Sequence, residues 1–274
     1  MRNKHAAGKN DLGRGNPWRD GAHGVTRPTF CRWILWVVFL LVVSARAEDV
    51  AASFDAANKL YEQGKFQEAA GAYEKLIQSG QVSAAVYFNL GNAFLKSGQI
   101  GKAVAAYRKV RGLTPRDPDL GANLQFARNQ VQGPTVATGK WEQFLGKFTV
   151  NEWTLWAASL VWIWLLLLCA LQLRPSLRPA LRGYLGGIGI AILVVGFCLG
   201  GVVCKIRTNR VAIVVSKDAP VHNGPLEESQ KSFVVHDGAE LNLLDQKDDW
   251  LQVSAGPGRV GWLKREQVVL ANGA

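Results

Sequence analysis

The feature that most constrains the fold of this chain is a set of landmark residues that recurs with a period of about 34 residues. Gly64 is followed at this spacing by Gly98, and Tyr73 by Tyr107. Apolar residues follow a helical period on both sides of each glycine, so each copy is predicted to be two helices joined by a turn. Such a unit cannot bury its apolar face alone and is stable only when it stacks on its neighbours. The repeats are therefore predicted to form a short helical array.

The second copy carries the residues that mark the type of repeat. They are Tyr87, Leu90, Gly91, Phe94, Ala103, Tyr107 and Pro115. This pattern resembles the tetratricopeptide repeat, in which small residues let two helices approach and aromatic residues fill the gap to the next hairpin. Pro115 is expected to stop the last helix, because proline lacks an amide donor and restricts the residue before it. We expect a repeat domain over residues 48–132, with repeats at about 50–83 and 84–117 and a solvating capping helix over 119–132.

By the tetratricopeptide pattern, the first helix of each repeat is expected to line a concave surface that binds a partner protein. The side chains predicted to project there are Phe54, Asn58, Tyr61 and Glu62 in the first copy and Phe88, Asn92, Leu95 and Lys96 in the second. We expect the amides of Asn58 and Asn92 to bond the backbone of an extended peptide, and Lys96 to pair with a carboxylate. The alternative is that both asparagines satisfy local backbone groups of the repeats.

A signal peptide is predicted at the start of the chain. Residues 1–47 contain a long basic leader, an apolar run from Trp33 to Val43, and a closing Ala45-Arg46-Ala47 of the kind that signal peptidase cleaves. The apolar run is short for a membrane span. An uncleaved anchor is the alternative, and it leaves the repeat domain on the same side of the membrane.

Two apolar runs without charged residues predict a pair of transmembrane helices, at residues 153–173 and 183–204. The loop between them, residues 174–182, contains three arginines, and short arginine-rich loops stay in the cytoplasm. Both flanking domains are therefore expected on the periplasmic, exported side of a bacterial inner membrane. The linker over residues 133–152 has aromatic residues at helical spacing, which predict either a helix in the membrane interface or a stub packed against the repeats.

The second apolar run contains two G-x-x-x-G spacings, Gly183/Gly187 and Gly196/Gly200. This spacing lets helix backbones approach each other closely in lipid. Docking on another membrane protein and packing within the hairpin are both compatible with it. Neither run contains Asp, Glu, Lys, Arg or His, so the sequence gives no support to a channel or a proton relay.

Residues 210–270 change to short alternating segments separated by turns rich in Asp, Gly and Pro, which predicts a small all-β barrel. The order of a hydrophobic strand, Trp250, a glycine turn and Gly261-Trp262 resembles the bacterial SH3-like domain. In such a domain Trp250 and Trp262 either pack the core or line a ligand groove. The sequence leaves these two alternatives open.

The predicted fold class is a multidomain membrane protein with all-α tetratricopeptide helical repeats, two transmembrane helices and a C-terminal all-β SH3-like barrel. This order of parts resembles the BatE-type proteins of the Bacteroides aerotolerance operons. The resemblance implies an envelope complex with von Willebrand A-domain membrane partners, another repeat protein and an AAA+ ATPase. It also implies a link to survival of oxidative stress.

No catalytic motif is found, and the four histidines and four cysteines show no metal-ligand spacing, so no enzyme activity, cofactor or metal is expected. The net charge of +11 is concentrated in the leader and beside the apolar runs, which indicates membrane topology rather than nucleic-acid binding. Two functions remain: a membrane-tethered scaffold for envelope proteins, or a cell-wall module that binds peptidoglycan through the SH3-like domain. We favour the scaffold, because wall-targeting SH3-like modules usually serve an amidase or peptidase, and the sequence shows neither.

Overall fold

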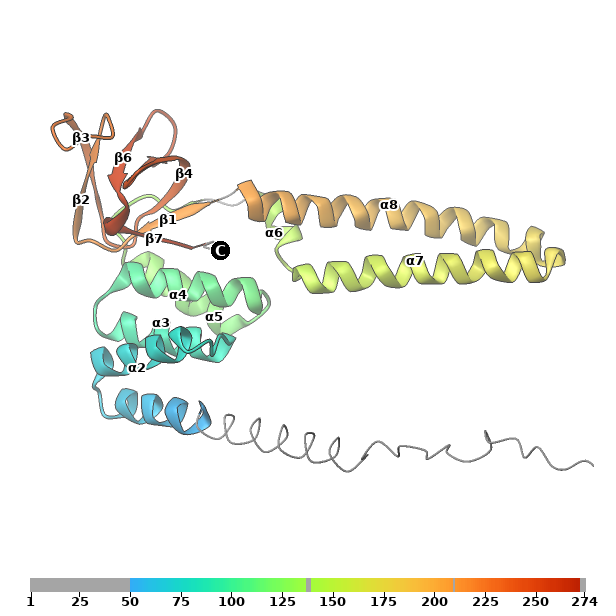
Figure 1. Ribbon diagram of the computed structural model, residues 1–274, viewed down its shortest axis with the longest axis horizontal. Helices are drawn as coiled ribbons and strands as arrows, with labels where there is room; N and C mark the ends of the chain where they lie inside the picture. Colours follow the sequence, from blue (N-terminus) through green and yellow to red (C-terminus); the bar gives the residue numbers. More distant parts are fainter. Residues whose placement is uncertain (1–49, 137–138, 209, 272–274) are drawn as a thin grey trace, which may run out of the picture. The chain divides into compact units, whose positions relative to one another are not determined.

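The computed structural model describes residues 50–136, 139–208 and 210–271. The predicted signal peptide and leader, residues 1–47, lie outside the described residues. The described part consists of a helical repeat region, a pair of long apolar helices and an antiparallel β domain, in that order along the chain (Figure 1).

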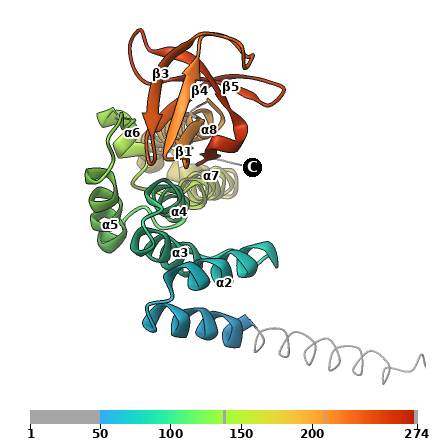
Figure 2. The same ribbon diagram turned by 90° about the vertical axis from the view of Figure 1, so that its left-hand side faces the viewer.

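The repeat region is built from stacked helical hairpins (Figure 2). Its helices are residues 50–62, α2 (Phe66–Gln78), α3 (Ala84–Lys96), α4 (Ile100–Leu113) and α5 (Pro118–Asn129). Gly64 and Gly98 make the turns within the two repeats, and each has a φ of +77°, a left-handed conformation that glycine adopts at little cost. Tyr73 and Tyr107 are almost completely buried in their repeats.

Helix α5 closes the array. Asp117 accepts hydrogen bonds from the backbone amides of Asp119 and Leu120. Pro118 occupies the first turn, where an amide donor is not needed. Leu120 and Leu124 are buried in the same apolar cluster as the repeat helices.

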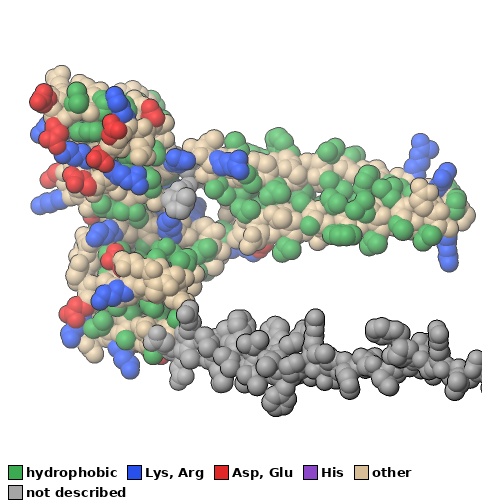
Figure 3. Space-filling model, viewed as in Figure 1, with side chains coloured by type: hydrophobic (Ala, Val, Ile, Leu, Met, Phe, Trp, Pro, Cys, Tyr) green, Lys and Arg blue, Asp and Glu red, His purple; other side chains and the backbone are tan. Residues whose placement is uncertain are grey.

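The two long apolar helices form a hairpin. They are α7 (Val150–Leu173) and α8 (Arg178–Thr208), joined by the 3-10 turn η1 (Pro175–Leu177). Both are long and apolar enough to cross a membrane by length and composition, with a mean hydropathy of 2.2 for α7 and 2.5 for Pro175–Thr208. Hydrophobic side chains are exposed along both helices, and basic side chains gather at the far end (Figure 3). The arginines Arg178 and Arg182 of the expected loop lie in the first turns of α8.

The four glycines of the G-x-x-x-G spacings face open space. A Cβ atom built on any of them would meet nothing within 4 Å. Contact between the two helices is made elsewhere, because the Trp164 indole donates a hydrogen bond of 3.2 Å to the Leu185 carbonyl. A Cβ atom on Gly189 would lie 3.9 Å from the same indole nitrogen. Packing within the hairpin therefore does not account for the spaced glycines.

Helix α6 (Lys140–Leu145) packs its apolar side against the hairpin. Leu145 is buried together with Trp153 of α7 and Cys198 of α8. The Trp153 indole donates a hydrogen bond of 3.3 Å to the Leu145 carbonyl. Trp141 and Phe144 remain 51% and 43% exposed. The aromatic linker thus belongs to the base of the hairpin, and its position in a membrane interface stays a prediction.

The β domain is one antiparallel sheet of seven strands in the order β3-β2-β6-β5-β4-β1-β7. The strands are β1 (Val211–Val214), β2 (Asp218–His222), β3 (Lys231–His236), β4 (Glu240–Lys247), β5 (Trp250–Ser254), β6 (Val260–Lys264) and β7 (Val268–Leu270), with the 3-10 turn η2 (Arg265–Gln267) before the last. Sequence reasoning did not predict β2, which contains Pro220. Strand β2 pairs with β6 only at His222, so Pro220 is paired with β3 on one side and with no strand on the other. Proline lacks an amide donor, and such a position does not need one.

Strand β1 lies next to α4 and contributes to two apolar cores, that of the repeats and that of the β domain (Figure 2). Val211 and Ile213 belong to the buried cluster of the repeat helices. Ala212 and Val214, on the other face of the strand, belong to the core of the β domain. Both faces of β1 are therefore buried, which explains its continuous apolar sequence.

A buried ion cluster lies at this junction. Glu240, at the start of β4, has a side chain with 0% exposure. Its carboxylate accepts hydrogen bonds from Arg108 of α4 at 2.7 Å, from Arg128 Nε of α5 at 2.8 Å and from the Val136 amide at 3.2 Å. Burial lowers the pKa of Arg108, and the negative charge of Glu240 opposes that shift. A carboxylate so far from water requires partners of this kind.

The β domain also caps helix α4. Gln99, at the N-cap position, makes no capping bond, and Asp237 Oδ1 instead accepts a hydrogen bond of 3.0 Å from the Gly101 amide. Burial raises the pKa of Asp237, and hydrogen bonds from backbone amides oppose that shift. A Cβ atom on Gly101 would lie 2.0 Å from the Val214 carbonyl oxygen. The equivalent residue of the first repeat is the exposed Gln67, so this glycine serves the junction and not the repeat pattern.

Replacement of the buried carboxylate tests the junction. Glu240→Ala is expected to destabilise the protein by about 3–5 kcal/mol, because Arg108 and Arg128 lose their buried counter-charge. Chemical denaturation of the full chain in detergent measures the change. The control is Glu266→Ala at an exposed position, for which we expect a change within about 0.5 kcal/mol. Equal unfolding midpoints for the two variants would contradict this role of Glu240.

Candidate functional site on the concave face of the repeats

The first repeat carries a fixed asparagine at the centre of its predicted groove. Asn58 Oδ1 accepts a hydrogen bond of 2.6 Å from the Tyr73 hydroxyl and one of 3.0 Å from Asn89 Nδ2. The Phe54 ring packs against Tyr73 with its centroid 6.0 Å away. Three helices therefore hold one amide oxygen: residues 50–62, α2 and α3.

The same arrangement recurs one repeat further along the chain. Asn92 Oδ1 accepts a hydrogen bond of 2.7 Å from the Tyr107 hydroxyl and one of 3.1 Å from Asn123 Nδ2. The centroids of the Phe88 and Tyr107 rings are 6.1 Å apart. Asn123 belongs to α5, which thus takes the place of the first helix of a third repeat in addition to closing the array. The sequence could have indicated this role of α5, since Asn89 and Asn123 are also separated by one repeat period.

The tyrosine of each pair is a reliable hydrogen-bond donor. Burial raises the pKa of both Tyr73 and Tyr107, so both hydroxyl groups stay protonated at neutral pH. A Cβ atom on Gly91 would lie 2.6 Å from the Tyr107 ring. In the first repeat Ala57 stands at the equivalent position and Tyr73 still bonds Asn58 at 2.6 Å, so the glycine permits the close approach of the Tyr107 ring but is not required for the tyrosine–asparagine bond.

A polar pocket of about 230 Å³ opens on this face. Its lining residues are Asn58, Tyr61, Glu62, Tyr73, Asn89 and Asn92. The sequence prediction named Tyr73 only as a landmark of the repeat and did not name Asn89, because it considered only the residues of the first helices expected to project into the groove. The oxygens of Asn58 and Asn92 are used within the repeats, whereas their Nδ2 groups have no hydrogen-bond partner among the described residues. The hydrogen bonds of both asparagines are therefore to side chains of the repeats and not to local backbone groups, and binding of a peptide by the Nδ2 ends stays a prediction.

The other predicted groove residues, Phe54, Phe88, Leu95 and Lys96, are not among the residues that line this pocket. Phe54, Phe88 and Leu95 are partly buried against the core of the repeats. Lys96 is exposed at the end of α3. Phe126 of α5 is 58% exposed and was not predicted.

Trp250 and Trp262 lie on the face of the sheet that is turned away from the β-domain core. Leu251 and Leu263, their neighbours in the strands, are fully buried, whereas both tryptophans are half-buried. The Trp250 ring meets the His222 ring edge-on, with 5.3 Å between centroids. His222 is the cross-strand partner of Trp262. The two tryptophans are therefore not members of the β-domain core; they border His222 on the outer face of the sheet.

The comparison with protein families agrees with the geometry of the repeats. The model of the tetratricopeptide repeat family matches residues 54–118, which include both asparagine–tyrosine pairs. A search of curated proteins finds no match to the chain. The chain thus combines tetratricopeptide helical repeats with two candidate membrane helices and a C-terminal antiparallel β domain. Repeats of this family generally bind other proteins.

Proposed function

We propose that this protein is a non-enzymatic, membrane-anchored scaffold that holds an extended segment of an envelope protein in the concave groove of its repeats. One observation carries the proposal: Asn58 and Asn92 line the same pocket, and each has its oxygen fixed and its Nδ2 group without a partner in the described chain. A repeated amide donor suits the repeated carbonyl groups of an extended peptide.

The tyrosines make this pair of donors rigid. Because each hydroxyl donates to the amide oxygen, the orientation of each amide is fixed by the repeats and its Nδ2 group is left for a ligand. Donors that are oriented before binding lose less conformational entropy when a ligand arrives. The groove spans few repeats, so we expect a modest affinity.

The charges of the groove give the bound segment a direction. Glu62 lies in the pocket, and Lys96 occupies the equivalent position one repeat later. A basic group of the partner would pair with Glu62, and a carboxylate, such as a C-terminus, with Lys96. The partner segment would therefore bind in one polarity.

The two candidate membrane helices and the arginine-rich end of the hairpin support a place in the bacterial inner membrane, with the repeats and the β domain on the exported side. By the resemblance to BatE-type proteins, the partners would be von Willebrand A-domain Bat proteins, and the complex would contribute to aerotolerance. The second candidate function is peptidoglycan binding through the β domain. The half-buried Trp250 and Trp262 beside His222 favour it.

The groove is tested by Asn92→Asp, which keeps an oxygen for Tyr107 and Asn123 but removes both amide donors. A photo-crosslinking amino acid at Phe126, an exposed residue of α5 to which the proposal assigns no contact, reports on the bound segment in cells that produce the full chain. We expect the yield of the crosslinked partner to fall about tenfold, in line with the loss of a buried hydrogen bond. Asn242→Asp, the same change at an exposed position of the β domain, is expected to leave the yield unchanged.

Equal yields from the two variants would contradict the groove. Pelleting of the protein with purified murein sacculi provides the comparison with the second function. Sedimentation that Trp250→Ala abolishes, with crosslinking unaffected by Asn92→Asp, would favour the cell-wall module.

The orientation in the membrane is tested with reporter fusions. Alkaline phosphatase is expected to be active when fused after Ala274 and inactive when inserted between Arg174 and Arg182, because the enzyme folds only after export. Activity of the reporter inside the hairpin loop would overturn the proposed topology.

A further inference from the structure

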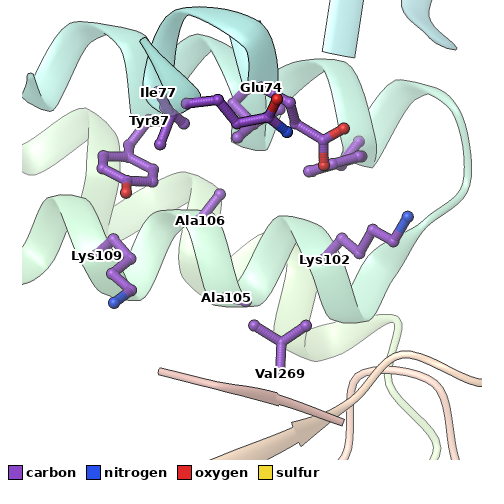
Figure 4. Close-up of a pocket in the computed structure, with 11 residues that line it drawn as sticks. Glu74, Ile77, Tyr87, Lys102, Ala105, Ala106, Lys109 and Val269 are labelled. Carbon is purple, nitrogen blue, oxygen red and sulfur yellow. The ribbon is translucent and has the colours of Figure 1, made fainter. Parts of the chain in front are cut away.

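A second groove, of about 320 Å³, lies where α2, α3 and α4 meet strand β7 (Figure 4). Ala105 and Ala106 of α4 lie between Ile77 of α2 and Val269 of β7 (Figure 4). The groove shares no lining residue with the concave pocket. Most of its lining side chains are apolar, and Val269 is 38% exposed.

Strand β7 ends the sheet beside this groove and has an open edge. The Val215 amide donates to the Gln267 carbonyl, and the Ala271 amide donates to the Val211 carbonyl. The backbone groups of Gln267 and Ala271, which flank β7, therefore face the β1 side. Because backbone groups of successive residues alternate between the two edges of a strand, Leu270 directs its amide and carbonyl to the other edge. No strand in the described part of the chain pairs with that edge. Such an edge is a template for another strand.

The groove continues an interface that already exists. Ile213 of β1 packs on the repeat helices, and its cross-strand partner in β7 is Val269. The two side chains therefore lie on the same face of the sheet, and Val269 faces α4 in Figure 4. Strands in a sheet are about 4.8 Å apart, so the next strand position falls beside Val269 and over α4. The apolar groove occupies this position.

We propose that an extended segment of a partner protein binds here as an additional strand beside β7, with alternate apolar side chains in the groove. The backbone of Leu270 supplies hydrogen bonds, and the groove selects side chains of the size of valine or leucine. Lys102 and Lys109 line the groove on α4, against the single carboxylate of Glu74, so an acidic residue beside the apolar ones is preferred over a basic one. This site is independent of the proposed concave groove.

A synthetic peptide of the sequence Asp-Val-Thr-Val-Thr-Val, labelled with fluorescein, is the probe. Fluorescence anisotropy with the full chain in detergent measures its Kd. Two further peptides carry N-methyl groups, one on the valine amides and one on the threonine amides. We expect one of the two to bind about tenfold more weakly and the other within about threefold of the parent, because only alternate amides face β7.

The protein side is tested at Leu270, whose amide points away from β1. Leu270→Pro removes that amide, while Leu270→Ala removes a similar amount of side-chain packing and keeps it. We expect about tenfold weaker binding of the peptide for proline relative to alanine. Asn92→Asp is expected to leave binding of this peptide unchanged, which separates this site from the concave groove.

Equal affinities of Leu270→Pro and Leu270→Ala, or of both methylated peptides and the parent, would overturn the proposal. The near-ultraviolet circular dichroism of both Leu270 variants checks that the β domain is folded. Should the proline variant fail this check, the comparison of the two methylated peptides on the unaltered protein still decides the question.

Discussion

The buried carboxylate of Glu240 is the interaction on which the arrangement of the folded domains depends. Its partners come from α4, from α5 and from the linker before α6, so this one side chain ties two helices of the repeat region and the linker to the start of β4. Replacement of such a cluster by apolar residues often stabilises proteins, whereas loss of a single partner is costly. The role of the Glu240 cluster is therefore to specify one position for the β domain on the last repeat. The cap that Asp237 places on α4 and the close approach at Gly101 act at the same junction.

The junction connects both candidate binding surfaces. Arg128, a partner of Glu240, lies on α5, and the same helix supplies Asn123, which fixes Asn92 in the concave groove. On the other side, the docking of β1 on α4 brings Val269 beside Ala105 and Ala106. Residues of both grooves are thus connected through contacts of the same junction.

The sequence was sufficient to predict the parts but not their contacts. The repeat period predicts the helical hairpins. The asparagines and tyrosines of the two pairs recur with the same period, and equal side chains on equal backbones make the same bonds. The junction could not be predicted in this way. Glu240 and Arg108 look like ordinary charged residues of a strand and a helix, and their burial depends on a partner far away in the sequence. Gly101 is likewise indistinguishable from a surface glycine until the Val214 carbonyl is known to lie against it. Strand β2 was missed because its proline weakens the strand pattern, and the outward position of Trp250 depends on the register of β5.

A distance measurement between the two domains tests the central claim most directly. Spin labels at Lys65 of the first repeat and Lys247 of β4, both exposed, can be introduced after replacement of the native cysteines. Pulsed electron paramagnetic resonance on the full chain in nanodiscs then gives the distribution of distances. The account predicts one narrow distance, which becomes broad when Glu240 is replaced by alanine. A broad distribution in the protein with Glu240 intact would contradict it.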